Sequence, residues 1–153
     1  MISLNVEQLK TLAIGSKNCQ QNLSLSAKDL LEFFRRESDE ETIPTQPTDL
    51  ALNFYNKSFI ETSQYVCLED DDSIGAFWSW FWLDNPQDGL SMRGSWNVPT
   101  QSTERDVLFV TPLCISKKYQ RNTNWWPLIQ ELLPNHKILS FERKERLVTI
   151  NNH

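Results

Sequence analysis

Two short cationic runs stand out in a chain whose net charge is −5: Lys117-Lys118-Tyr119-Gln120-Arg121 and Arg143-Lys144-Glu145-Arg146. Cations this close together can form charge-assisted hydrogen bonds with the oxygens of a phosphate or carboxylate group. The same pattern is also typical of a solvated surface, where most lysines and arginines lie. Each run therefore has two interpretations, an anion-binding patch and a hydrated face.

Four consecutive carboxylates, Glu69-Asp70-Asp71-Asp72, resemble a calcium ligand set at first sight. A calcium loop needs acidic residues at alternate positions and a later glutamate that binds through both oxygens. The run lacks that spacing, so it is interpreted as a solvated hairpin turn. Glu69, Asp84 and Glu104 fall near the ends of predicted strands, where a carboxylate could take a proton from an amine or lie at the surface.

Motifs of the common catalytic classes are missing from the sequence: it contains no HExxH, GxSxG, P-loop, GxGxxG or paired CxxC. Its two histidines, His136 and His153, leave little material for a histidine-dependent triad or a zinc site. No catalytic residue is assigned from the sequence, and no metal site is expected.

Length, charge and cysteine content limit the class of protein. With 153 residues the chain has the size of one domain, and 1–153 is treated as a single unit. The net charge of −5 opposes general binding to nucleic acid phosphates. Cys19, Cys67 and Cys114 form no CxxC pair, which favours a reducing compartment. No apolar run is long enough to span a membrane, so a cytoplasmic location is expected.

The hydrophobic pattern changes near residue 64, from helical spacing to strand-like runs. Before that point the polar segment 37–48, which contains Pro44 and Pro47, predicts a mobile loop between two helices. The pattern as a whole predicts an α+β fold with N-terminal helices, a mostly antiparallel central sheet and one C-terminal helix. The predicted helices are 4–14, 26–36, 50–60 and 123–133, and the predicted strands are 64–69, 74–83, part of 90–98, 106–116, and a closing strand or hairpin at 136–141 and 146–150.

Two local signals fix the details of this pattern. Ser26 is a favourable N-cap, and Asp29 follows it at the position of an acidic capping box. Pro112 interrupts the most apolar run, 106–116, which is otherwise typical of a buried central strand. Proline cannot donate a hydrogen bond to a ladder, so this position predicts a bulge or a splay between strands.

The predicted strand 74–83 is unusually aromatic. Strict alternation places Trp78, Trp80 and Trp82 on one face, and Phe77 and Phe81 on the other. One face belongs to the core. The tryptophan face either packs beneath helices or remains partly exposed as a binding surface for a protein, a sugar or a flat ligand.

The segment 113–128 and this order of elements resemble the GNAT superfamily of N-acetyltransferases. In that superfamily a central strand ends in an apolar residue and continues into a loop of the form x-x-x-Tyr-Gln/Arg-x-x-Gly-x-Gly/Ala and then a helix. Here Ile115 is the last apolar residue of the strand, and Tyr119-Gln120 match the motif. Thr123 and Trp125 stand at the two glycine positions.

This resemblance implies an acyl-CoA cofactor, whose pyrophosphate binds successive backbone N–H groups of the loop and whose pantetheine arm meets the bulged strand. The cofactor-binding residues that the resemblance implies are Cys114, Ile115, Lys117, Lys118, Gln120, Arg121, Thr123 and Asn124. Trp125 leaves two outcomes open. Either the loop binds coenzyme A, or the indole ring takes the place of the pantetheine arm and coenzyme A does not bind.

Two functional hypotheses follow. The first is an acyl-CoA-dependent N-acyltransferase of GNAT type, or a degenerate descendant of one. The short C-terminal part also resembles the GNAT-like toxin-activating lysine acyltransferases, although their N-terminal histidine has no counterpart here. The alternative is a non-enzymatic domain that binds a partner protein or has a structural role, such as a virion component or an inhibitor of a host enzyme encoded by a phage or mobile element.

Overall fold

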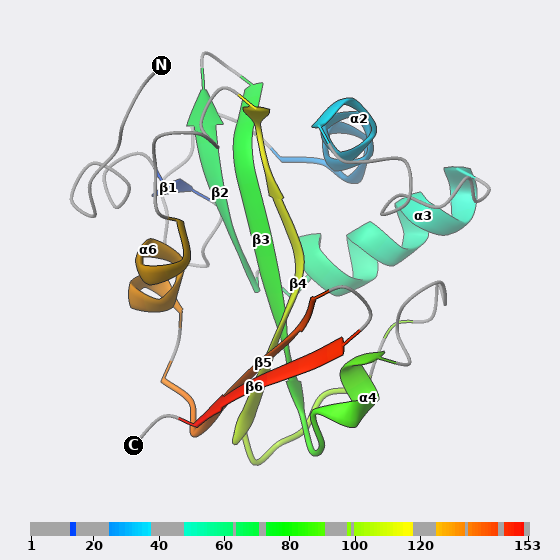
Figure 1. Cartoon of the computed structure of the whole chain (residues 1–153). Coiled ribbons are helices and arrows are strands. Elements are labelled where there is room, and N and C mark those ends of the chain that lie inside the picture. The colour runs from blue at the N-terminus through cyan, green and yellow to red at the C-terminus, as the bar shows by residue number, and fades with distance from the viewer. Residues whose placement is uncertain are drawn as a thin grey trace.

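The computed structural model describes residues 13–14, 25–37, 48–62, 64–70, 73–90, 98, 100–117, 125–133, 135–143 and 146–151. Most of the helices precede the main run of strands, and one further helix lies in the chain between two neighbouring strands of the sheet (Figure 1). The elements are β1 (Ala13–Ile14), α2 (Ala27–Glu37), α3 (Thr48–Tyr55), the π-helix η1 (Asn56–Ile60), β2 (Tyr65–Asp70), β3 (Ser73–Leu83), α4 (Gln87–Leu90), β4 (Val107–Ile115), α6 (Trp125–Leu132), β5 (Ile138–Arg143) and β6 (Arg146–Asn151).

The strands form one sheet in the order β1-β2-β3-β4-β5-β6. Neighbouring strands are antiparallel except β4 and β5, which are parallel, so the sheet is mixed. A parallel pair needs a crossover connection, and α6 lies in that connection. The α+β class with N-terminal helices is confirmed. The helix predicted at 123–133 is present as α6, but it precedes β5 and is not C-terminal, and no helix follows β6 in the part of the chain described.

The start of α2 has the expected capping arrangement. The backbone N–H of Asp29 donates to Ser26 Oγ (3.2 Å), and the N–H of Ser26 donates to Asp29 Oδ2 (3.3 Å). These reciprocal bonds satisfy two donors that the first turn of a helix otherwise leaves unpaired. The buried face of the helix consists of Ala27, Leu30, Leu31, Phe33 and Phe34.

Other predicted elements need correction or lie outside the described residues. Ala13 and Ile14, predicted as the end of a helix, form β1 and pair with Leu68 and Cys67 of β2. A short isolated helix is only marginally stable in water. Pairing with the open edge of a sheet instead satisfies the backbone groups of these residues. Residues 38–47 of the predicted mobile loop and 91–97 of the predicted strand at 90–98 lie outside the described residues.

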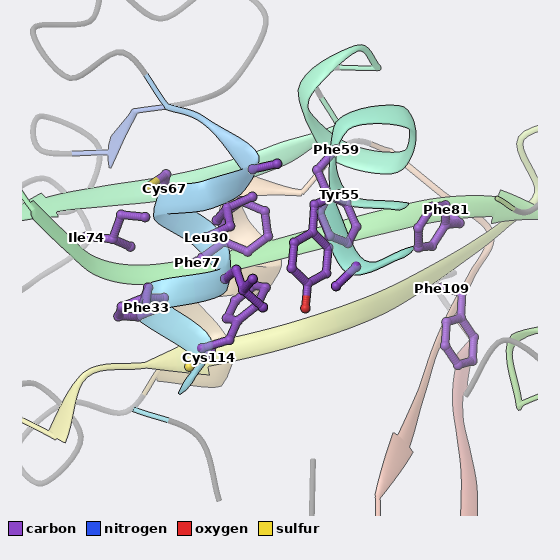
Figure 2. Close-up of a cluster of buried hydrophobic side chains, with 14 of the residues drawn as sticks. Leu30, Phe33, Tyr55, Phe59, Cys67, Ile74, Phe77, Phe81, Phe109 and Cys114 are labelled. Carbon is purple, nitrogen blue, oxygen red and sulfur yellow. The ribbon is translucent and has the colours of Figure 1, made fainter. Parts of the chain in front are cut away.

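Both faces of β3 are buried. Phe77 and Phe81 of β3 lie against α2 and η1, and Phe109 of β4 belongs to the same buried cluster (Figure 2). On the opposite face the three tryptophans of β3 pack with residues of α6, β4 and β5, and none is more than 7% exposed. The interpretation of the Trp78–Trp80–Trp82 row as an exposed binding surface is therefore wrong. The row belongs to the core.

Side-chain amides cover the edge of β3 where β2 no longer reaches it. The last pair of the β2–β3 ladder at this end is Tyr65 with Ser79. Beyond it, Gln64 Nε2 donates to the Trp80 carbonyl (3.2 Å), and Gln101 Oε1 accepts from the Trp82 N–H (3.1 Å). The two glutamine amides also bond each other reciprocally, at 2.8 Å in both directions. They replace a further strand and satisfy backbone groups of a buried segment.

Gly89 of α4 approaches the ring of Phe109 so closely that an added Cβ would overlap the ring atoms. We expect Gly89→Ala to destabilise the protein by about 1–3 kcal/mol, because the buried ring must leave its position to admit the methyl group. Urea unfolding measures this cost. In a Phe109→Leu background the cost should be smaller, since the obstructing ring is gone. An equal cost in both backgrounds would contradict the steric explanation.

Candidate functional site

Strand β4 contains a bulge where proline was expected to disturb the ladder. Trp80 pairs with Val110 and Trp78 pairs with Leu113, so two steps along β3 correspond to three along β4. The extra residue falls at Thr111–Pro112. Because Pro112 has no N–H, it can leave the ladder without orphaning a donor. The predicted bulge is confirmed.

The ladder between β4 and β5 ends beside this bulge. It consists of the pairs Val107–Ile138, Leu108–Leu139 and Phe109–Ser140, although both strands continue further. In Figure 1, β5 and β6 run away from β4 at an angle beyond this point. The expectation of a splay between strands is thus also confirmed. The divergence and the bulge begin within one residue of each other.

Leu113 lies on β4 within this diverging region. The N–H of Ser116 donates to the Gly75 carbonyl at 2.8 Å, which places residue 116 and, by alternation, residue 114 with their backbone groups toward β3. Leu113 therefore directs its backbone N–H and C=O away from β3, to the side on which β5 departs. Its side chain is 45% exposed although it pairs with the fully buried Trp78.

Aromatic residues of α6 and β5 lie on the same face of the sheet. Trp126 packs on Phe141 with ring centroids 4.5 Å apart. Both rings, together with Ile115, are partly buried against the cluster that contains Trp78. The region of divergence thus combines a bulged strand with an exposed leucine, and apolar side chains from β4, β5 and α6 share its face.

The end of β4 is tied to the end of α2 by a carboxylate. Glu37 Oε2 accepts a hydrogen bond from the backbone N–H of Lys117 at 3.1 Å, across 80 residues of sequence. Glu37 Oε1 accepts from Arg36 Nε at 3.1 Å. The Glu37 side chain is only 13% exposed, whereas that of Arg36 is 53% exposed. Both oxygens of a mostly buried carboxylate are therefore held.

Only three of the proposed cofactor-binding residues fall in the described part of the chain. Cys114 is buried on the face covered by α2, Ile115 is half-buried on the opposite face, and Lys117 is exposed just beyond the strand. The structure thus brings these three to the end of β4 but not onto one face. The remaining proposed residues lie outside the described residues: Lys118, Gln120, Arg121, Thr123 and Asn124.

The candidate acids and bases from the sequence are scattered. Asp84 and Glu104 are exposed, and His136 is half-buried just before β5. Among the described residues, no three His, Cys, Asp or Glu side chains gather closely enough to hold a metal ion. The same residues include no helix that is both long and apolar enough to cross a membrane.

Tyr55 is a buried hydroxyl group on the helical side of the sheet. It is 6% exposed, meets Phe34 edge-on at 5.4 Å and stacks on Phe59 at 5.7 Å (Figure 2). Burial raises the pKa of Tyr55 from 10.0 to about 12, and the positive charge of Arg35 opposes this in part. The hydroxyl therefore keeps its proton far above neutral pH and cannot act as a base there.

Comparison with known proteins gives a structural likeness without a sequence match. No family model and no curated protein matches the sequence. The structure is similar to the crystal structure of the loading GNATL domain of CurA from Lyngbya majuscula, with a TM-score of 0.51 and 13% sequence identity. The fold is GNAT-like. The likeness covers 75% of this chain and 58% of that one, so it spans less than two thirds of the CurA domain.

Sequence reasoning missed the residue that links the end of α2 to the end of β4. Glu37 was assigned to the mobile loop because it begins an acidic, proline-containing stretch, yet it is the last residue of α2. A single sequence carries no signal for its contact with Lys117, which lies 80 residues away. Tyr55 falls within the helix predicted at 50–60, and the sequence carries no signal of its environment, which depends on packing against Phe34 of α2.

The raised pKa of Tyr55 makes stability depend on alkaline pH. Between pH 10.0 and about 12 the unfolded chain loses this proton while the folded chain keeps it. The contribution is therefore fully present below pH 10.0 and is lost as the pH rises toward about 12, and its size is on the order of 2–3 kcal/mol. Urea unfolding across this range should show a steeper loss for the wild type than for Tyr55→Phe. If the free energy of unfolding falls with pH in parallel for the two proteins, the contribution assigned to Tyr55 is wrong.

Proposed function

We propose that this protein is a GNAT-like acyl-CoA-dependent N-acyltransferase, or a descendant that keeps the binding site for the thioester arm. The observation that supports this most directly is the end of the β4–β5 ladder at Phe109, beside the bulge in β4. In this proposal the arm lies along β4 where β5 diverges. The likeness to the CurA domain supports the proposal through the fold alone.

The shape and chemistry of β4 fit an extended, amide-containing arm. The pantetheine part of coenzyme A carries amide groups along a thin chain, and such a chain can pair with a strand edge as a peptide does. Leu113 directs its backbone groups to that side, and its exposed side chain supplies an apolar contact. Ile115 and Phe141 belong to the same partly buried apolar surface.

Bound acyl-CoA would supply an acyl group activated as a thioester, which an amine attacks to form a C–N bond as the C–S bond breaks. The chain's own part is to hold the arm in place and to exclude water from it. The Leu113 N–H beside the bulge is suited to stabilise negative charge on the carbonyl oxygen, since it already points away from β3. Phosphate contacts in this proposal fall to Lys117, Lys118 and Arg121, with backbone groups of the following residues.

A second candidate, a protein-binding domain without catalysis, is favoured by β6. This strand is the last in the sheet and is exposed at four of its six positions, including Ile150 at 37%. An edge strand offers main-chain groups with which a partner's strand can pair. The two candidates differ in their response to acyl-CoA, which only the first requires.

Leu113 gives the decisive test. We expect Leu113→Glu to weaken binding of acetyl-CoA by about tenfold or more, because the variant loses an apolar contact and places a carboxylate beside the arm. Isothermal titration calorimetry measures the affinity. The matched control is Leu50→Glu on α3, since Leu50 is similarly exposed at 49% and makes the same change in charge.

Circular dichroism and thermal unfolding should show that both variants fold, because both positions are exposed. Unchanged affinity in Leu113→Glu would place the arm elsewhere on the molecule. If the folded wild type gives neither a heat of binding nor a thermal shift with acetyl-CoA, the acyltransferase proposal is wrong and the protein-binding candidate takes its place.

A further inference from the structure

The contact between Glu37 and Lys117 is located where α2 ends beside the end of β4 (Figure 1). Lys117 is the second residue after β4 and follows Ser116. Its backbone N–H donates to the Glu37 carboxylate at 3.1 Å. Arg36 braces the same carboxylate from within α2. A negatively charged group of the chain itself is thus bound at the amide that opens the proposed phosphate-binding segment.

The position of Glu37 is unfavourable for the helix to which it belongs. The C-terminus of a helix carries partial negative charge, which stabilises cations and opposes carboxylates. Arg35 and Arg36 in the last turn of α2 follow that preference, whereas Glu37 does not. Helix stability therefore gives no reason for an acid here. Of the two hydrogen bonds that its oxygens accept, the one from Arg36 is local and the one from the Lys117 N–H is tertiary, and the side chain is only 13% exposed.

A backbone N–H that donates to this carboxylate cannot donate at the same time to a phosphate oxygen. Carboxylate and phosphate oxygens are alike as acceptors of charge-assisted hydrogen bonds. Arg36 and Lys117 both have exposed side chains, so two cations would remain at this junction if the carboxylate moved away. The junction is then more attractive to an anion than it is with Glu37 in place.

We infer that Glu37 is an internal stand-in for a phosphate group, which occupies the Lys117 amide until a pyrophosphate-bearing ligand displaces it. The inference rests on the proposed function for the identity of the natural ligand, acyl-CoA. Its chemistry requires only an anion with phosphate oxygens. Removal of the negative charge at Glu37 should therefore tighten the binding of pyrophosphate instead of weakening it.

The test uses the full chain labelled with ¹⁵N and inorganic pyrophosphate as the probe. The chemical shift of the Lys117 amide is followed during titration of the wild type, of Glu37→Gln and of the control Glu32→Gln. Glutamine keeps an acceptor of similar shape, but a neutral acceptor releases the amide more readily because charge-assisted bonds are roughly twice as strong. Glu32 is exposed on α2, so the control makes the same change in net charge away from the contact.

We expect the Lys117 amide of Glu37→Gln to respond at a pyrophosphate concentration about tenfold lower than in the wild type. Glu32→Gln should follow the wild type. Equal responses in Glu37→Gln and the wild type, or a Lys117 amide that responds in neither, would overturn the inference. So would a control that gains affinity as Glu37→Gln does, because the effect would then be one of general charge.

The outcome is distinguishable from that of the proposed function. Pyrophosphate lacks the acyl and pantetheine parts, so the Lys117 response does not depend on the contact made by Leu113. If Glu37→Gln gains affinity for pyrophosphate while acetyl-CoA binding does not depend on Leu113, the inference stands and the acyltransferase proposal fails. If acetyl-CoA binding depends on Leu113 but the Lys117 amide does not respond to pyrophosphate in any variant, the acyltransferase proposal stands and the inference about Glu37 fails.

Discussion

Strand β4 is held by β3 along most of its nine residues but by β5 along only the first three. This unequal pairing is the constraint on which the candidate site depends. A strand paired on both sides along its whole length would have no backbone groups to offer a ligand, because the ladders would use them. The bulge at Thr111–Pro112 changes the register at the place where β5 departs, so the two irregularities act together.

The parallel pairing of β4 and β5 also explains the burial of the tryptophan row. A parallel connection must cross over one face of the sheet, and here the crossing element is α6. Ile129 and Leu133 from this segment reach the cluster that contains Trp78 and Trp80. The helices α2 and α3 cover the opposite face, so β3 becomes apolar on both sides. An aromatic strand of this kind is typical of a three-layer interior and carries no information about a partner.

The features that the sequence predicted correctly are those determined by neighbouring residues. Ser26 and Asp29 cap α2 because they lie three positions apart, and Pro112 produces a bulge because the missing N–H is its own property. Contacts between distant segments escaped prediction. The strand at Ala13–Ile14 exists only because β2 offers an edge, and the parallel direction of β5 depends on how α6 packs. The contact between Glu37 and Lys117 depends on the whole fold, because the sheet must form before the two meet.

The magnitudes of the interactions at α2 decide what a ligand could displace. Phe33 and Phe34 are buried against the sheet, and loss of such a side chain costs about 3–5 kcal/mol. The hydrogen bond between Glu37 and Lys117 contributes less, about 1.5–3 kcal/mol for a bond to a charged group. The core therefore fixes the position of the helix, and the carboxylate can leave without moving it. A ligand that competes for the amide therefore has to replace one hydrogen bond, whereas α2 keeps its position. In the proposed competition for the Lys117 amide, a change that strengthens the Glu37 contact therefore weakens the binding of the phosphate-bearing ligand.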